Sequence, residues 1–84
     1  MHYNDLKVET KERRRTRALR EPAKTKERAN NIAMRATTNN PVSVLALGKV
    51  TDFAHHCIML GSDDDQAVEA TRKFIEQLNG NPVR

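Results

Sequence analysis

Hydrophobic side chains recur at helical spacing through the second half of the chain. Asn40 and Pro41 supply an N-cap and a proline at the first helical position, and Gly61 stands where a helix-ending glycine is expected. Between them the apolar positions follow a three-to-four-residue period, on Val42, Leu45, Ala46, Val50, Phe53, Cys57 and Leu60. We predict a helix over residues 41–60, in which Gly48 would permit a close helix crossing.

A second amphipathic helix is predicted over residues 63–79. Ser62 and Asp65 have the spacing of a capping box, and the acidic run that starts at Asp63 suits the positive end of a helix dipole. Asn79 and Gly80 are typical helix-ending residues. Apolar side chains again share one face, on Ala67, Ala70, Phe74, Ile75 and Leu78. Because the turn between the two helices is only about two residues long, they should form an antiparallel hairpin.

Pro22 divides the more polar N-terminal half. Proline lacks a backbone N–H and disfavours helix in the residue before it. The segment 22–36 has a modest apolar face and is predicted as a helix, whereas residues 1–21 form a basic helix or arm. The predicted fold is therefore all-α: a small helical domain over residues 22–84, with helices at about 22–36, 41–60 and 63–79, preceded by the arm.

The small size of the chain predicts that its core is completed by a partner. There are 84 residues, 37% of them hydrophobic, and small domains of this kind usually need a disulfide, a metal or another chain. The single Cys57 cannot form an internal disulfide. We therefore expect the hairpin to complete its core with residues 29–36, by forming a homo-oligomer, or by both. The residues predicted to fill the core or the oligomer interface are Leu45, Val50, Phe53, Cys57, Leu60, Phe74, Ile75 and Leu78.

Charge is distributed unevenly along the chain. Residues 1–40 hold eleven Lys and Arg against five Asp and Glu, and residues 41–84 hold four against six, so the two halves carry +6 and −2. A row of guanidinium groups suits phosphates, because each presents a fork of donors. On one uninterrupted helix, five of the basic residues would form a single stripe that Pro22 cuts or kinks. The predicted contact residues are Arg13, Arg14, Arg15, Arg17, Arg20, Lys24 and Arg28.

These features predict binding to nucleic-acid phosphates with little base specificity. The segment PVSVLALGKV offers few polar groups to base edges, and Tyr3 is too isolated to build a stacking platform. The alternatives left open are a protein–protein module, an oligomer that captures a small phosphorylated ligand, and a merely solvated basic face. Such a module would be an inhibitor, an adaptor or a small subunit of a virion or ribonucleoprotein that meets an acidic partner surface.

The sequence predicts no enzyme, cofactor or metal site. Asp52 and His56 are four residues apart and could face one metal ion, but Cys57 falls on the apolar stripe, where a thiol behaves as a small hydrophobe. Neighbouring side chains on a helix point about 100° apart, so His56 and Cys57 would not meet as a catalytic pair. No segment has the pattern of a secretory signal or a membrane span, and we expect a reducing, cytoplasmic or nucleoid-associated location.

Overall fold

The computed structural model describes residues 10–80, which form four α-helices. They are α2 (Lys11–Arg20), α3 (Pro22–Ala36), α4 (Val44–Met59) and α5 (Asp64–Leu78). Helix accounts for 79% of the described part of the chain, which confirms the all-α prediction. Residues 1–9 of the basic arm or helix predicted at 1–21 lie outside the described range, as do the last four residues of the chain.

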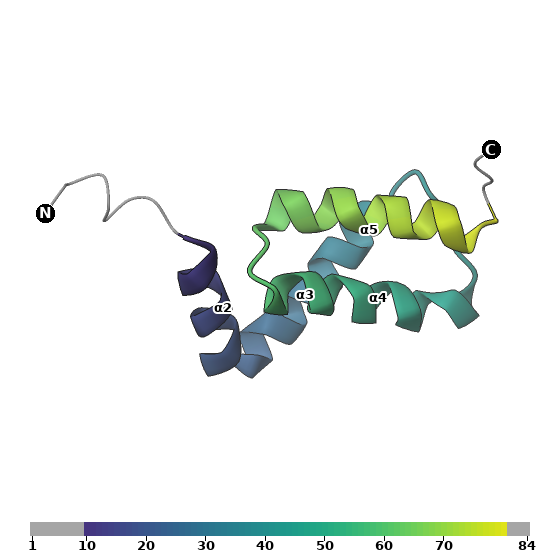
Figure 1. Cartoon of the computed structure of the whole chain (residues 1–84). Coiled ribbons are helices and arrows are strands. Elements are labelled where there is room, and N and C mark those ends of the chain that lie inside the picture. Colours follow the sequence, from purple (N-terminus) through teal and green to yellow (C-terminus); the bar gives the residue numbers. More distant parts are fainter. Residues whose placement is uncertain (1–9, 81–84) are drawn as a thin grey trace, which may run out of the picture.

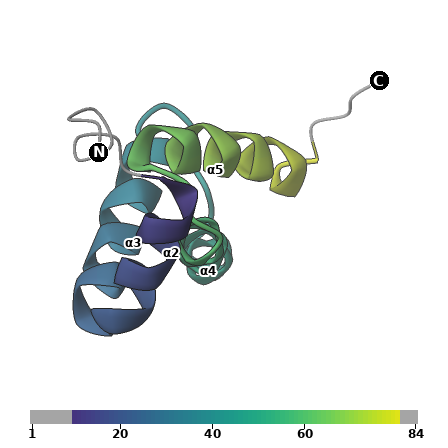
Figure 2. The same ribbon diagram turned by 60° about the vertical axis from the view of Figure 1, so that its left-hand side comes forward.

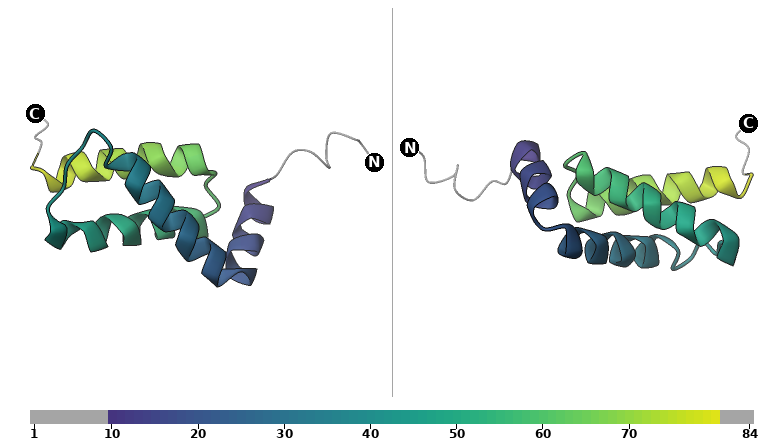
Figure 3. Two further views of the ribbon diagram at one scale, coloured as in Figure 1. Left: turned by 180° about the vertical axis from the view of Figure 1, so that it is seen from behind. Right: turned by 90° about the horizontal axis from the view of Figure 1, so that it is seen from below.

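Helices α3, α4 and α5 pack against one another, and α2 contacts α3 and α4 at one end of this group. In Figure 1, α4 and α5 lie side by side and run in opposite directions, while α3 crosses them. The views from behind and from below show the same arrangement, with α2 next to the turn between α4 and α5 (Figure 3). In Figure 2, α2 lies in front of α3.

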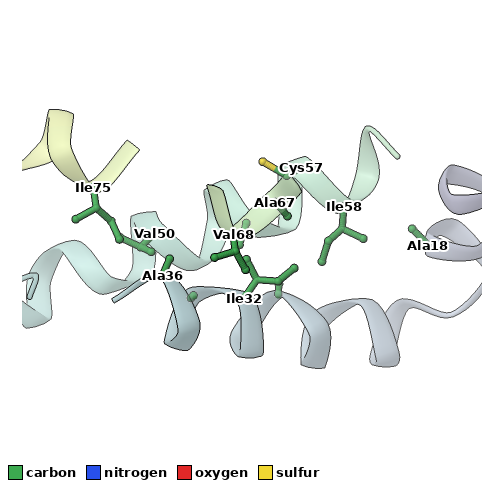
Figure 4. Close-up of a cluster of buried hydrophobic side chains, with 12 residues drawn as sticks. Ala18, Ile32, Ala36, Val50, Cys57, Ile58, Ala67, Val68 and Ile75 are labelled. Atoms are coloured by element: carbon green, nitrogen blue, oxygen red, sulfur yellow. The ribbon is translucent and has the colours of Figure 1, made fainter. Parts of the chain in front are cut away.

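Small side chains fill much of the space between the helices. Ile32 from α3 and Val68 from α5 point toward each other in the centre of the core (Figure 4). Around them lie further buried residues, of which six are alanines: Ala18, Ala29, Ala33, Ala36, Ala54, Ala67, Val50, Cys57, Ile58 and Ile75. The rings of Phe53 and Phe74 stack at the edge of this core, with centroids 4.4 Å apart. Alanine-rich faces allow close helix packing but bury little apolar area per residue.

The break between α2 and α3 occurs at Pro22, as the sequence predicts. In a continuous helix the Ala18 carbonyl would accept a hydrogen bond from residue 22, but proline has no N–H to donate. The buried hydroxyl of Thr25 lies 2.9 Å from that carbonyl oxygen and 2.9 Å from the carbonyl oxygen of Glu21. Thr25 therefore provides a donor for a buried carbonyl that the proline leaves without its helical partner.

α4 begins three residues after its predicted start, and α5 begins one residue after its predicted start. Ser43, not Asn40, is the N-cap of α4, and its hydroxyl accepts a hydrogen bond from the amide of Ala46. Pro41 therefore precedes α4 and does not occupy its first helical position. The capping box of α5 uses Asp63 and Gln66, one residue beyond the predicted Ser62 and Asp65. An aspartate carboxylate caps a helix as well as a serine hydroxyl does. The sequence was therefore compatible with a cap at either Ser62 or Asp63.

Gly61 ends α4 in a way that requires glycine. Its φ is +97°, in the left-handed region, and its amide donates to the Ile58 carbonyl while the amide of Ser62 donates to the Cys57 carbonyl. These two bonds form a Schellman motif, which closes the helix. Gly48 differs, because a Cβ there would meet no other atom within 4 Å. The predicted close crossing at Gly48 is absent from residues 10–80.

We predict that Gly61→Ala destabilises the chain more than Gly80→Ala. Both glycines have positive φ, so each substitution carries a backbone cost of roughly 1–2 kcal/mol. At Gly61 the new Cβ would also lie 2.6–2.8 Å from atoms of Lys11 and Arg15, whereas the space around Gly80 is open. Urea unfolding and the rate of trypsin cleavage within α2 measure the difference. Equal unfolding midpoints and cleavage rates for the two variants would contradict the close approach of α2 to Gly61.

Candidate functional site

Helix α2 presents basic side chains on two opposite faces. Ala18 is its buried residue and marks the face that meets the rest of the fold. Arg13, Arg17 and Arg20 follow one another at spacings of four and three and therefore share the other side of the helix. Together with Glu12, Thr16 and Glu21 these three arginines line a shallow surface depression. We call Arg13, Arg17 and Arg20 the outer arginines.

The inner face of α2 is basic as well, but it contacts the turn between α4 and α5. The Nε of Arg14 donates a hydrogen bond of 2.5 Å to the carbonyl oxygen of Gly61, and Arg14 is half-buried. The aliphatic stems of Lys11 and Arg15 lie beside Gly61, where they would meet any added Cβ. Long basic side chains commonly cover a neighbouring surface with their stems and keep their charged ends near solvent. Arg14 and Arg15 therefore help to hold α2 in place.

One edge of α3 is basic and pairs with the first turn of α5. Arg28 contacts a single carboxylate oxygen of Asp64 through two nitrogens, Nη2 at 2.6 Å and Nε at 3.2 Å. Two helical turns later, Nη2 of Arg35 lies 3.2 Å from a carboxylate oxygen of Asp65. A shallow cleft brings the same acidic turn together with three arginines, and its lining residues are Arg14, Arg17, Arg28, Asp63, Asp64 and Asp65. The acidic run thus has partners as well as a capping role.

The seven predicted contact residues consequently fall into three groups. The outer arginines lie on α2, Arg14 and Arg15 face Gly61, and Lys24 and Arg28 belong to α3. The stripe expected on one uninterrupted helix is divided, because the chain leaves helical geometry at Glu21, where φ is −127° and ψ is +68°. Lys24 is exposed on α3, whereas Arg28 is engaged with Asp64.

Five of the eight predicted core or interface residues lie in the core or against it. Val50, Cys57 and Ile75 are buried, and Phe53 and Phe74 pack on the core edge. The other three are solvent-accessible: Leu45 is 91% exposed, Leu60 49% and Leu78 36%. Leu45 and Leu60 therefore lie outside the core of one copy, and their predicted alternative role at an oligomer interface stays a prediction. Leu45 lies five residues before Val50 and so points about 140° away from it around the helix, while Leu60 follows the last helical residue.

Leu45 and Leu78 belong to an apolar surface that the sequence pattern did not reveal. Val44 is 86% exposed and Leu47 44%, and both lie in the first turn of α4 together with Leu45. Leu45 and Leu78 also line one shallow groove, which includes Ser43, Ala46, Lys49 and Asn79. This surface lies at the end of the α4–α5 pair that is distant from α2 (Figure 1). We call Val44, Leu45, Leu47 and Leu78 the apolar end.

The residues weighed as a metal site do not form one within the described chain. No group of three or more His, Cys, Asp or Glu side chains in residues 10–80 is placed to hold a metal ion. Asp52 and His56 are exposed on α4, while Cys57 is buried. Burial raises the pKa of the Cys57 thiol above its ordinary value of 9.0, which leaves little nucleophilic thiolate near neutral pH.

Comparison of the chain with protein families, curated proteins and solved structures finds no match. Over residues 10–80, no helix combines the length and apolar character needed to cross a membrane.

Sequence reasoning missed the pairing between the acidic run and the arginines of α3. Arg35 was not among the predicted contact residues, although it lies seven positions after Arg28 and therefore on the same helix edge. That spacing, together with three consecutive acidic residues at a helix start, is a signal that could have suggested complementary faces. The contact of Arg14 with Gly61 had no such signal, since 47 positions separate the two residues.

Proposed function

We propose that this chain is a non-enzymatic binding protein whose outer arginines and Lys24 contact nucleic-acid phosphates with little base specificity. The observation that carries the proposal is the composition of α2. It holds six basic residues but gives the core only Ala18, and three of its arginines line the solvent-facing depression. Folding alone does not account for a helix with so much charge and so little burial.

The spacing of the outer arginines is compatible with a nucleic-acid backbone. Arg13 and Arg20 are seven residues apart, or about 10 Å along the helix axis, which is close to three base-pair steps of about 3.4 Å. Guanidinium forks bind phosphate oxygens through paired hydrogen bonds. Apart from charged residues, α2 exposes only Thr16 and Leu19. These side chains offer few groups that could recognise base edges, so the proposal includes no sequence specificity.

We predict that replacing the outer arginines by alanine weakens binding to random duplex DNA and RNA in a salt-dependent way. Loss of three phosphate contacts should reduce the slope of log affinity against log salt by about 2.7 for duplex DNA. The matched control replaces Lys26, Arg72 and Lys73 by alanine. These residues are exposed on α3 and α5, and their replacement removes the same charge. Fluorescence anisotropy titrations at several salt concentrations measure both variants, and circular dichroism checks their folding.

Two results would count against the nucleic-acid proposal. One is no detectable binding of the native chain at moderate salt, and the other is an equal loss of affinity in the two triple variants. Recovery of one stoichiometric acidic protein with the native chain would instead favour the alternative, a protein–protein module such as an adaptor or a small subunit of a larger assembly. Binding of a small phosphorylated compound without any binding of nucleic acid would favour the phosphorylated-ligand alternative.

We also propose that α4 and α5 act as a helical hairpin whose core is completed by a second copy of this chain. The apolar end supports this proposal, because large aliphatic side chains there are exposed, Leu45 to 91%. Lys49 is the charged residue in the groove that Leu45 and Leu78 line. Since the apolar end lies away from α2, two copies could meet there without bringing their basic helices together (Figure 1). The proposed location remains cytoplasmic or nucleoid-associated.

We predict that the native chain has a mass above 9.6 kDa in light scattering and that Leu45→Glu lowers it to the monomer value. The substitution places a charge at the proposed interface without touching the core of one copy, so helicity should be retained. Met34→Glu is the control, because Met34 is 67% exposed on α3, outside the apolar end. A monomeric native chain, or equal masses for the native protein and Leu45→Glu, would contradict self-association at this surface.

A further inference from the structure

The acidic first turn of α5 occupies arginines that belong to the basic surface. Asp63, Asp64 and Asp65 line one cleft with Arg14, Arg17 and Arg28, and Arg28 contacts Asp64 at 2.6 Å. Arg35 extends this acidic contact by its pairing with Asp65. We infer that Asp64 and Asp65 restrict nucleic-acid binding by competing with phosphates for these arginines. The inference rests on the proposed function and describes its regulation.

A carboxylate and a phosphate bind an arginine side chain through the same kind of contact. Both offer negatively charged oxygens that accept hydrogen bonds from the guanidinium fork, so Arg28 cannot satisfy Asp64 and a phosphate fully at once. The three carboxylates also repel an approaching polyanion electrostatically. The acidic turn thereby limits the phosphate-binding surface to the outer side of α2 and to Lys24.

The two ion pairs are partly exposed to solvent, as expected if phosphates can displace the aspartates reversibly. The side chain of Arg28 is 26% exposed and that of Asp64 51%, and Arg35 and Asp65 are more exposed still. Ion pairs in such positions are weak and are screened by salt. A polyanion at high local concentration can therefore displace them.

The acidic turn can be neutralised without removing the cap of α5. Asp63 is the residue that forms the capping box with Gln66, and it stays unchanged. Asp64 and Asp65 occupy the first two helical positions and contribute only a modest favourable interaction with the helix dipole. Asp64→Asn and Asp65→Asn keep the shape of both side chains while removing the charges that hold Arg28 and Arg35.

The test compares Asp64→Asn/Asp65→Asn with Glu69→Gln/Glu76→Gln, which makes the same charge change at exposed positions farther along α5. Each protein is titrated with random duplex DNA at several salt concentrations, and circular dichroism verifies helicity. Each released arginine should steepen the salt slope by about 0.9, so the first double variant should exceed the control by up to about 1.8. Adding Arg28→Ala to that variant should remove roughly half of the gain. The single variant Asp64→Asn replaces the double variant if the latter loses helicity.

Each other outcome has a definite meaning. Equal slopes and affinities in the two double variants would overturn the competition, because the effect would then depend on net charge alone. Weaker binding by the Asp64→Asn/Asp65→Asn protein would overturn it too, since the carboxylates would then be orienting the arginines for binding. No binding by any protein, including the native chain, would reject the proposed function itself, and the inference would fall with it.

Discussion

The contact of α2 with Gly61 determines how the basic residues of this chain are divided. Gly61 takes a left-handed conformation that ends α4, and its carbonyl accepts the hydrogen bond from Arg14. The absence of a side chain leaves room for the backbone and stem of Lys11. With one side of α2 committed to this contact, Arg13 and Arg20 face away from it. Arg17 lies at the border between the two sides, because it lines both the outer depression and the acidic cleft. The break at Pro22 and the hydroxyl of Thr25 fix the other end of the helix.

Electrostatic complementarity supplements a core made largely of small side chains. α2 adds only Ala18 to that core, so polar and charged contacts carry much of its attachment. Arg28 and Arg35 join α3 to the first turn of α5, and the same turn is stabilised by its capping box and by the helix dipole. Interactions of this kind weaken as salt screens them, whereas the contacts among α3, α4 and α5 depend on apolar burial. The two ends of the molecule therefore differ in character: one is basic and the other is apolar.

Local sequence signals predicted the positions of the helices well. They did not predict which segments, far apart in the sequence, contact each other. Pro22 marked the division between α2 and α3 because a missing N–H acts within its own helix turn. The helix-ending role of Gly61 was similarly predictable, because this glycine directly follows an apolar stripe. The start of α4 was misjudged because Asn40–Pro41 and Ser43 are both plausible signals, and only the backbone conformation selects Ser43. The direction in which each arginine of α2 points depends on the position of Gly61 in the folded chain. No local sequence pattern encodes that position. The exposure of Leu45 likewise depends on which side of α4 the other helices cover.

The division of the arginines between two faces can be measured directly by modification with a dicarbonyl reagent, followed by mass spectrometry. In the free chain Arg13 and Arg20 should react quickly, and Arg14, half-buried against Gly61, should react slowly. Saturating duplex DNA should then protect Arg13 and Arg20 and leave the slow rate of Arg14 nearly unchanged. Equal reactivity of Arg13 and Arg14 in the free chain, or no protection of Arg13 and Arg20 by DNA, would contradict this account.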